Sequence, residues 1–319
     1  MSERLKVLLT GATGFIGAGI VRELCQSPRY NVTAAVRRKD SVPGHATVVV
    51  GDIGGGTDWS EALRHQKVVI HLAGQSAVSG KARAFDLENL REVNVAGTVN
   101  LARQAAGSGV RRFIFISSVK IHGEQTLPGR PFNADSAPRP EDEYAASKLE
   151  AEKALRAVAL ESGMELVIIR PPMVYGPGGG GNFALLATAV HRKWPLPFGA
   201  VKNRRALVAL DNLVDLVIKC IDHPNAVNRA FLVSDGEDLS TPELLRRMAA
   251  ALDTPSLVMS FPPGLLALAA MCLGKKRLVQ RLTGSLEVDI SETRNLLNWK
   301  PPLSVDEGLS RCLVRSREK

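Results

Sequence analysis

The 319-residue chain lacks several features that mark large classes of protein. Its four cysteines, Cys25, Cys220, Cys272 and Cys312, lie far apart and without metal-ligand spacing, so we predict no metal site. We expect these thiols to be small buried hydrophobes in a reducing compartment. No secretory signal opens the chain, because the apolar run Val7–Thr10 ends in a Gly-Ala-Thr-Gly turn. These absences predict a cytoplasmic protein.

Long hydrophobic runs are also missing. The most membrane-like stretch, Gly264–Leu273, is too short to span a bilayer, and the basic residues Lys275, Lys276 and Arg277 follow it. Two interpretations stay open for this stretch: a helix in the membrane interface with a basic flank, or a core helix of a substrate-binding lobe. We expect no stable membrane insertion.

The net charge of +9 invites a nucleic-acid interpretation, but aromatic residues make up only 5% of the chain. The Lys and Arg residues are scattered rather than grouped. A basic groove for anionic dinucleotides and nucleotide sugars explains the charge as well. We therefore predict a nucleotide ligand and no nucleic-acid partner.

Short β-branched runs alternate with helical patterns through the first half, as is typical of βαβ units. The continuous hydrophobicity of Phe113–Ile116 fits a strand covered on both faces. The predicted fold is α/β, a doubly wound parallel sheet (Rossmann) with a smaller, mostly helical carboxy-terminal substrate lobe. The predicted strands are Lys6–Thr10, Asn31–Val36, Thr47–Val50, Val68–Leu72, Arg112–Ser117 and Leu166–Arg170, and the predicted helices are Ile16–Cys25, Trp59–Arg64, Leu90–Ser108 and Tyr144–Ser162.

The composition changes after Arg170. Residues 171–181 are too rich in glycine and proline for regular structure, whereas 206–210 and 230–233 resemble strands that return to the sheet. We therefore predict two domains from separated segments. Residues 1–171 plus 206–235 form the nucleotide-binding domain, and residues 172–205 plus 236–319 form the substrate lobe.

A glycine-rich turn joins the first predicted strand to the first predicted helix. Gly11, Gly14 and Gly17 allow the backbone to turn tightly and approach a pyrophosphate, while the helix N-terminus faces its negative charge. The turn predicts a dinucleotide site. Its predicted contacts are Gly11, Thr13, Gly14, Phe15, Ile16 and Gly17.

The second predicted strand ends in Arg37 and Arg38, where NAD enzymes of this fold usually carry an acidic residue. The arginine pair favours the phosphate of NADP, with NAD as the alternative; an exposed pair on a solvated turn is a further possibility. The ends of the next two strands supply other predicted cofactor contacts, namely Asp52, Ile53, Leu72, Ala73 and Gly74.

Tyr144 precedes Lys148 by four residues on a predicted helix, which places the phenol and the ammonium on one face. The cation should favour the phenolate and lower the pKa of Tyr144. Such a tyrosine suits the interconversion of a carbonyl and an alcohol. An upstream serine pair, Ser117 and Ser118, completes the pattern.

Together these motifs resemble the extended short-chain dehydrogenases/reductases, in particular the NAD-dependent epimerase/dehydratase superfamily, which acts mainly on nucleotide-activated sugars. The match covers essentially the whole chain. The motifs are Gly11-x-x-Gly14-x-x-Gly17, Asp52-Ile53, Leu72-Ala73-Gly74, Asn94-x-x-Gly97-Thr98, Ser117-Ser118, Tyr144-x-x-x-Lys148, Val174-Tyr175-Gly176-Pro177 and Leu297-Asn298-Trp299-x-Pro301.

The resemblance implies a role for each matching residue. Tyr144 is the acid/base, Lys148 holds the cofactor ribose and tunes Tyr144, and Ser118 hydrogen-bonds the reacting oxygen. Further implied contacts are Asn94 and Pro171 with the cofactor, and Asn182 and Arg204 with the substrate diphosphate. The resemblance also implies a homodimer, formed by the helices near Leu90–Ser108 and Tyr144–Ser162.

Two departures from the family pattern affect the substrate site. Met173 stands where the family's epimerases usually carry asparagine, and Lys120 stands where a small or hydroxyl residue is common. Lys120 is therefore a candidate substrate contact, with a solvated loop position as the alternative. Both departures count against plain epimerisation.

The narrower match concerns Val119–Glu124 and Ser234–Asp238, which resemble reductases of bacterial polysaccharide and O-antigen pathways. Those enzymes reduce UDP-4-keto-6-deoxy-N-acetylhexosamines, and similar proteins are often labelled UDP-glucose 4-epimerases. We therefore favour a reductase of a UDP-4-keto sugar. An NAD-dependent UDP-sugar 4-epimerase is the alternative, and a non-catalytic nucleotide-binding scaffold is a remote one.

Overall fold

The structure is a computed structural model, which describes residues 3–39, 41–42, 44–75, 87–262, 264–266, 271 and 276–314. Asp40 and most of Gly264–Leu273 lie outside these residues.

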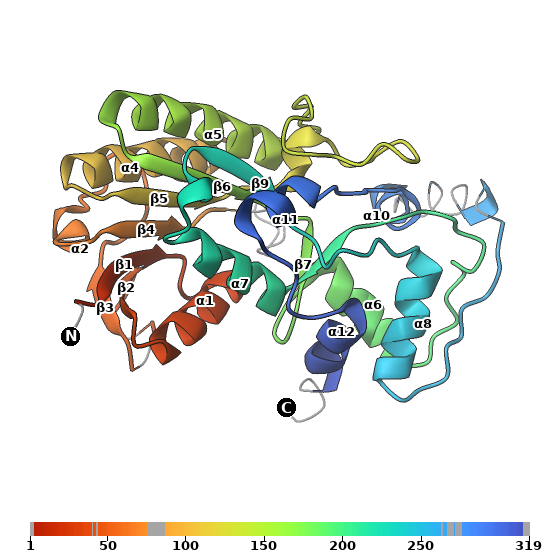
Figure 1. Cartoon of the computed structure of the whole chain (residues 1–319). Helices are drawn as coiled ribbons and strands as arrows, with labels where there is room; N and C mark the ends of the chain where they lie inside the picture. The colour runs from red at the N-terminus through yellow and green to blue at the C-terminus, as the bar shows by residue number, and fades with distance from the viewer. Residues whose placement is uncertain are drawn as a thin grey trace.

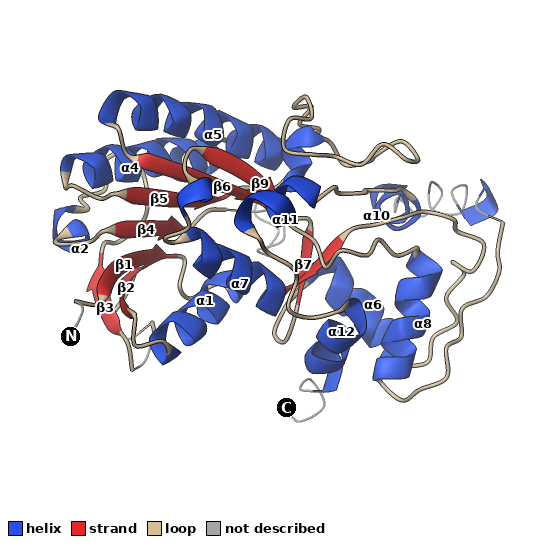
Figure 2. Cartoon of the chain, in the orientation of Figure 1, coloured by secondary structure: helices blue, strands red, loops and turns tan. Residues whose placement is uncertain are grey.

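A seven-stranded, wholly parallel sheet forms the centre of the larger lobe, with the strand order β3-β2-β1-β4-β5-β6-β9 (Figures 1 and 2). The order reverses between β1 and β4, which is where ligands bind in doubly wound sheets. The predicted Rossmann architecture is thereby confirmed. The strands are β1 (Leu5–Thr10), β2 (Tyr30–Val36), β3 (Ala46–Val49), β4 (Val68–His71), β5 (Arg112–Ile116), β6 (Glu165–Arg170) and β9 (Arg229–Leu232).

Helices cover both faces of this sheet. Helices α4 (Thr98–Gly107) and α5 (Glu143–Ser162) pack together on one face, and α1 (Phe15–Gln26) and α7 (Leu210–Cys220) pack together on the other (Figure 1). The homodimer that the resemblance implies through α4 and α5 stays a prediction. The remaining described elements before the second lobe are α2 (Ser60–Leu63), α3 (Leu87–Arg91), the π-helix η1 (Glu92–Gly97), and the 3-10 helices η2 (Val119–His122) and η3 (Pro224–Ala226).

The second lobe is mostly helical and lies beyond the carboxyl ends of the strands (Figure 2). Its hydrophobic core is separate from the two clusters that line the large sheet. The boundaries of the two lobes stay a prediction. The described helices in the second part of the chain are α6 (Gly181–His191), α8 (Thr241–Ala251), α10 (Lys276–Thr283), α11 (Ser291–Leu297) and α12 (Val305–Val314).

Two strand predictions near the lobe boundary were wrong. The segment 206–210 does not return to the large sheet: β8 (Leu207–Ala209) pairs with β7 (Met173–Tyr175) in a two-stranded sheet of its own. The strand β7 itself lies inside the stretch that was expected to be irregular. The return predicted for 230–233 is confirmed, since β9 pairs with β6.

The position of β8 explains why it stays outside the large sheet. Leu207 and Ala209 belong to the core of the second lobe, whereas Val208 between them belongs to the core beneath the large sheet. Successive side chains of a strand point to opposite faces, so β8 separates the two cores and buries both of its faces.

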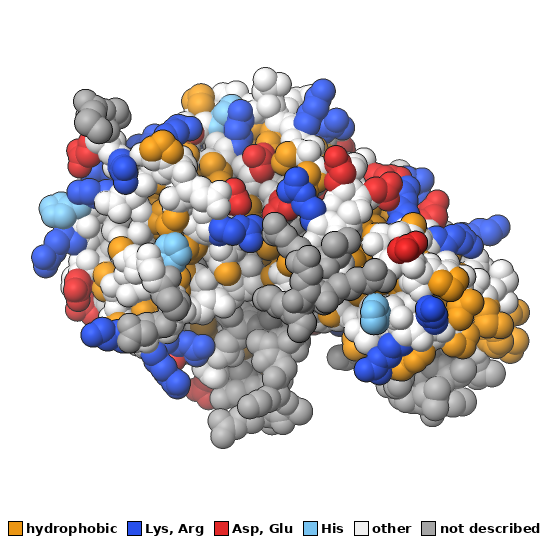
Figure 3. All heavy atoms as spheres, turned by 90° about the horizontal axis from the view of Figure 1, so that it is seen from below, with side chains coloured by type: hydrophobic (Ala, Val, Ile, Leu, Met, Phe, Trp, Pro, Cys, Tyr) orange, Lys and Arg blue, Asp and Glu red, His pale blue; other side chains and the backbone are white. Residues whose placement is uncertain are grey.

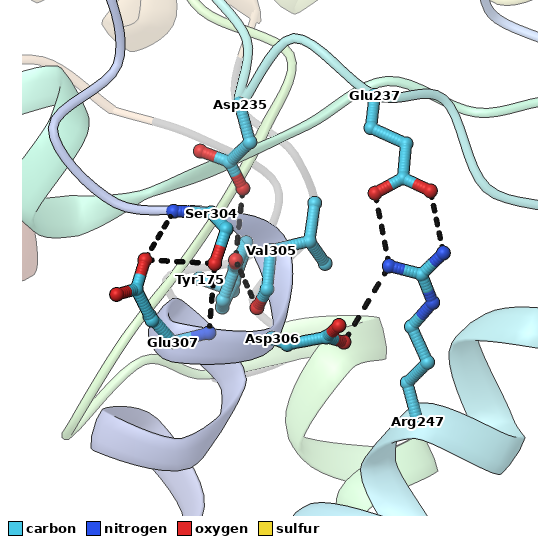
Figure 4. A network of polar contacts seen from close by, with 8 residues as sticks. All are labelled: Tyr175, Asp235, Glu237, Arg247, Ser304, Val305, Asp306 and Glu307. Atoms are coloured by element: carbon cyan, nitrogen blue, oxygen red, sulfur yellow. Dashed lines mark hydrogen bonds and ion pairs between the residues drawn. The ribbon is translucent and has the colours of Figure 1, made fainter.

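A buried polar network connects the two lobes beside β8 (Figure 4). The Tyr175 hydroxyl lies 2.8 Å from Asp235 Oδ2 and 3.3 Å from the Val305 carbonyl oxygen. Asp235 Oδ1 accepts hydrogen bonds from the Ala209 N–H and from Asn212 Nδ2, at 2.8 and 2.7 Å. The network joins β7, the end of β9, α7 and α12, so it links segments far apart in the sequence.

The cysteine prediction is correct only in part. Cys220 and Cys312 are buried, but Cys25 is exposed on α1, and Cys272 lies outside the described residues. Over the described ranges, no group of three metal-ligating side chains comes together. Over the same ranges, no helix has the length and apolar character needed to cross a bilayer.

Candidate active site

The glycine turn after β1 forms a tight backbone cradle. A Cβ at Gly17 would lie 2.1 Å from the Gly11 carbonyl oxygen, so only glycine lets α1 begin this close to the end of β1. Gly11 has a φ of +76°, and a Cβ there would lie 2.8 Å from the Ala73 nitrogen. No side chain caps the N-terminus of α1. A closely packed turn at a helix N-terminus fits the pyrophosphate of a dinucleotide.

The other predicted residues of this turn face different surroundings. Thr13 and Gly14 are exposed, and the half-buried Ile16 packs against the core. Phe15 also packs against this core, and its ring lies against the loop between the lobes, because Cβ atoms at Gly176 and Gly179 would be 3.3 and 3.0 Å from its Cζ.

A buried polar chain supports the backbone beside the cradle. Thr10 Oγ1 lies 2.7 Å from His71 Nδ1, and His71 Nε2 lies 2.9 Å from Thr98 Oγ1. Thr10 Oγ1 also accepts from the N–H groups of Leu72 and Ala73, at 3.3 and 3.2 Å. Burial, and then the positive charge of Lys148, lower the pKa of His71 to about 3, so the ring is neutral. The sequence analysis assigned no role to Thr10 or His71.

Asn94 connects the end of β4 to the helix that carries Tyr144. Its Oδ1 accepts from the Gln75 N–H at 2.7 Å, and its Nδ2 donates to the Gln75 carbonyl and to Ser147 Oγ, each at 3.0 Å. Ser147 Oγ in turn donates to the Tyr144 carbonyl oxygen at 2.8 Å. Asn94 lies in the π-helix η1, a distortion that often occurs at functional sites. The structure therefore gives Asn94 a positioning role.

Arg37 and Asp52 meet at the outer end of the cofactor site. Arg37 Nη1 lies 3.7 Å from Asp52 Oδ1, and both side chains are largely exposed, as is Arg38. Ile53 turns inward instead, since a Cβ at Gly97 would lie 2.5 Å from its Cγ2. Arg37 and Asp52 are thus available to a ligand, whereas Ile53 packs the π-helix against the sheet.

Ser118, Tyr144 and Lys148 lie at the carboxyl ends of the central strands. Ser118 follows β5, is buried, and caps η2 by accepting from the Lys120 N–H at 3.3 Å. The Val119 N–H donates to the Pro171 carbonyl at 3.1 Å, which fixes the serine turn beside Pro171. Tyr144 and Lys148 are one turn apart on α5, and α5 packs against η2. The predicted catalytic residues are therefore brought to one region.

Lys148 is buried and points toward the cofactor side of the sheet. Its Nζ donates to the Ile116 carbonyl at 3.0 Å and lies 4.6 Å from the centre of the Phe115 ring. A Cβ at Gly74 would lie 3.6 Å from the same Nζ. Burial lowers the pKa of Lys148 to about 8. This ammonium thus lies beside the Ala73–Gly74 backbone, where a cofactor ribose is expected.

The predicted lowering of the Tyr144 pKa is wrong for the chain alone. Burial, and then the negative charge of Asp142, raise the pKa of Tyr144 to about 12. Lys148 does not compensate, because its ammonium is engaged by the Ile116 carbonyl and the Phe115 ring. At neutral pH Tyr144 is therefore a protonated phenol.

Lys120 does not lie free to contact a substrate. Its Nζ forms an ion pair with Asp142 and another with Glu124, the latter at 2.6 Å. Glu124 also pairs with Arg281 of α10 at 3.1 Å. Although burial acts to raise the pKa of Asp142, the bonds from Lys120 and from the Ala145 N–H hold it below its ordinary value. Lys120 thereby joins the serine turn to the cap of α5.

This arrangement predicts opposite pH shifts for two substitutions. Asp142→Asn keeps the side-chain cap on the Ala145 N–H but removes the charge that raises the pKa of Tyr144. As the acid/base that the resemblance implies, Tyr144 would act on an alcohol as the phenolate, so the acidic limb of the kcat/KM profile is expected to move to lower pH. Lys120→Met leaves Asp142 unscreened, and the same limb is expected to move to higher pH.

The double variant Lys120→Met/Asp142→Asn removes both charges, and its limb is expected to lie between those of Asp142→Asn and the unmodified protein. Profiles measured across the alkaline range for all four proteins test this. Equal losses of rate at every pH, with no movement of the limb, would show that the ion pair is only structural.

A second buried ion pair lies behind Lys148 and was missed by the sequence analysis. Arg170 donates two hydrogen bonds to the Glu152 carboxylate of α5, from Nε at 3.0 Å and from Nη2 at 2.7 Å. Its Nη1 lies 3.2 Å from His122 Nε2. The Arg170 bonds keep the pKa of Glu152 low although burial acts to raise it. Burial, and then Arg170, lower the pKa of His122 to about 4. The Tyr-x-x-x-Lys-x-x-x-Glu spacing was a signal for Glu152, because residues four apart share one helix face.

The two predicted diphosphate contacts lie in the second lobe. Asn182 is in the first turn of α6. Arg204 is exposed, and its Nε lies 3.5 Å from Glu287 Oε2. Burial, and then the Glu287 charge, raise the pKa of nearby Asp238 to about 6, and Arg204 opposes this effect. Their contact with a substrate stays a prediction.

Comparison with known proteins agrees with this geometry. The profile of the NAD dependent epimerase/dehydratase family matches residues 7–234. A UDP-glucose 4-epimerase from Vibrio cholerae is 50% identical over 303 residues, which span 95% of this chain and 92% of the relative. That match favours the epimerase alternative over the reductase that the sequence analysis preferred.

Solved structures support the fold. A UDP-glucuronic acid 4-epimerase from Bacillus cereus, in complex with NAD, superposes with a TM-score of 0.80 at 20% identity, covering 98% of this chain and 97% of that chain. The Bordetella bronchiseptica enzyme WbmG, in complex with NAD and UDP, gives a TM-score of 0.75 at 17% identity, covering 99% and 95%. The family profile over residues 7–234 and the 50% identical relative show that the chain belongs to the NAD dependent epimerase/dehydratase family.

Proposed function

We propose that the protein is an NAD-dependent UDP-sugar 4-epimerase, which inverts the configuration at C4 of a UDP-hexose. The observation that carries this proposal is the assembly of Ser118, Tyr144 and Lys148 beside a glycine cradle, in a chain 50% identical to a UDP-glucose 4-epimerase. Bound NAD would take up a hydride from C4 and give it back. The residues of the chain bind, orient and exchange protons around that transfer.

Tyr144 carries the proton exchange in this proposal. In its phenolate form Tyr144 removes the proton of the C4 hydroxyl as a ketone forms, and the resulting phenol later returns that proton to the same oxygen. Ser118 donates a hydrogen bond to that oxygen, so negative charge on it is held by a fixed donor. Lys148 binds the cofactor ribose. Lys148 is one turn from Tyr144 on α5, so a rotation of its ammonium away from the Ile116 carbonyl and toward the phenol would also favour the phenolate.

Inversion further requires that both faces of the sugar ring be presented to the same hydride donor. The diphosphate must therefore stay held while the sugar turns over. We assign this holding role to Asn182 and Arg204. The pairing of Arg204 with Glu287, at 3.5 Å, is weak because the arginine is well exposed. A diphosphate carries more charge and can accept two hydrogen bonds from the guanidinium, so it would compete successfully for Arg204.

The test is an assay without added cofactor. Purified protein is incubated with UDP-glucose and, separately, with UDP-N-acetylglucosamine, and the products are resolved by NMR. Acid release and chromatography identify the nucleotide that copurifies. Formation of the 4-epimer together with released NAD supports the proposal. No epimer from either substrate, with no copurified NAD, contradicts it.

A second candidate function rests on the end of β2. Arg37 occupies the position where an acidic residue usually accepts from the ribose of NAD, and an arginine there suits the extra phosphate of NADP. NADP-dependent reduction of a UDP-4-keto-6-deoxy-N-acetylhexosamine, as in O-antigen precursor synthesis, uses Tyr144 as proton donor. Stoichiometric loss of NADPH absorbance with that ketone, and slower loss with NADH, would establish the reductase in place of the epimerase.

A further inference from the structure

The second lobe carries a group of large apolar side chains on its outside. Figure 3 shows hydrophobic side chains gathered at the end of the molecule that this lobe occupies, with Lys and Arg beside them. Six of them are between 40% and 58% exposed, which is unusual for such large residues. We call them the outer patch, and its members are Trp194, Leu257, Met259, Phe261, Leu265 and Met271.

Backbone pairing holds part of the outer patch together. The Leu196 N–H donates to the Leu257 carbonyl, and the Met259 N–H donates to the Leu196 carbonyl, each at 2.9 Å. The Gly199 N–H donates to the Met259 carbonyl at 2.9 Å. Residues 196–199 and 257–259 therefore lie side by side, and Trp194 is two residues before the first paired residue.

The outer patch is distinct from the core of its own lobe. Leu266 is buried in that core, while its neighbour Leu265 is exposed. Val258 packs against the core, while Leu257 and Met259 on either side of it face outward. The core is thus filled by other residues, and folding of the lobe does not require the outer patch.

The segment that carries Trp194 is basic. Residues 191–202 contain Arg192, Lys193 and Lys202, all exposed, and no Asp or Glu. The Arg192 guanidinium lies 5.6 Å from the centre of the Trp194 ring. An amphipathic tryptophan, exposed aliphatic side chains and basic residues are the features of a surface that inserts shallowly into an anionic bilayer.

We propose that the outer patch docks the protein on the surface of an anionic lipid membrane. The apolar side chains enter the boundary between headgroups and acyl chains, and the basic residues contact lipid phosphates. A purely apolar partner would not need the cations, and an acidic protein partner would not need six exposed apolar side chains. This inference is independent of the reaction that the active site performs.

Vesicle flotation tests the proposal with the full-length protein. Vesicles of phosphatidylcholine mixed with phosphatidylglycerol are compared with vesicles of phosphatidylcholine alone, at low and high salt. We expect binding to the mixed vesicles, weaker at high salt.

Arg192→Gln/Lys193→Gln is expected to weaken partitioning about fivefold for each cation removed. Met259→Asp/Phe261→Asp is expected to weaken it at least about tenfold.

Leu160→Asp is the matched control, because Leu160 is a highly exposed leucine on α5 of the larger lobe. It is expected to leave vesicle binding unchanged. Thermal unfolding shows whether each variant is folded, and size exclusion gives its oligomeric state. Failure of the unmodified protein to float with the mixed vesicles overturns the proposal. The proposal is also overturned if Met259→Asp/Phe261→Asp binds the mixed vesicles as well as the unmodified protein does. It is likewise overturned if this variant alters the oligomeric state but not vesicle binding.

Discussion

Replacement of Tyr144 by phenylalanine is expected to lower turnover by roughly 10²–10⁴-fold, the range that one positioned acid/base group contributes. The hydroxyl is the only atom removed, and the ring keeps its half-buried place on α5. Lys148 and the glycine cradle stay intact, so cofactor affinity is expected to change little. Single-turnover kinetics and cofactor titration, measured on the same preparation, check both parts of this prediction.

The matched control is Tyr30→Phe. Tyr30 is one of only three tyrosines in the chain, and its hydroxyl is buried without a hydrogen-bond partner in the described structure. Loss of an unpaired buried hydroxyl is expected to leave turnover unchanged and stability equal or slightly higher. If Tyr144→Phe behaved like this control, another residue would have to carry the proton.

The Gly17→Ala variant is expected to lose cofactor affinity by roughly a hundredfold, the cost that a displacement of about 1 Å can cause at a site. The new methyl group would meet the Gly11 carbonyl oxygen at 2.1 Å; that oxygen belongs to the backbone, and the methyl is fixed directly to the backbone of α1. Either α1 or the end of β1 must move. Overpacking of this kind costs about 1–3 kcal/mol of stability, partly offset by the better helix propensity of alanine. Titration with NAD and urea unfolding measure the two effects.

Gly107→Ala is the corresponding control. Gly107 is also a helical glycine, at the end of α4, and a Cβ there would meet nothing within 4 Å. This substitution is expected to stabilise the protein by up to about 1 kcal/mol and to leave cofactor affinity unchanged. Similar cofactor affinities for the two variants would mean that the cradle does not bind the dinucleotide.

Local patterns in the sequence were sufficient to predict the strands of the large sheet and the places of Ser118, Tyr144 and Lys148 on its elements. Most strands of the larger lobe are short apolar runs followed by a turn, and β1 and β5 were predicted to within one residue at each end. Tyr144 and Lys148 share a helix face because residues four apart lie one above the other on an α-helix. The positions of Ser118 and of the glycine turn were predictable because each comes directly after a predicted strand.

Features that depend on distant partners were not predictable in this way. β8 has the composition of a sheet strand, but its neighbour β7 and the second core behind it decide where it pairs. Lys120 was a candidate substrate contact with a solvated loop position as the alternative, and its ammonium instead forms ion pairs with Asp142 and Glu124. The pKa of Tyr144 depends on burial and on the charge of Asp142, and neither is encoded by the four-residue spacing of Tyr144 and Lys148.

The Tyr175–Asp235 junction has a consequence for recombination among members of this family. Its partners come from β7, α7, the end of β9 and α12, so the second lobe is not a contiguous cassette. A chimera that exchanges this lobe needs crossovers on both sides of β8. The residues at positions 175 and 235 must then come from parents that both carry the Tyr175–Asp235 pair. A single crossover would leave one of them buried without its partner. New substrate specificities in this scaffold are therefore expected to arise by point substitutions and loop changes rather than by exchange of whole lobes.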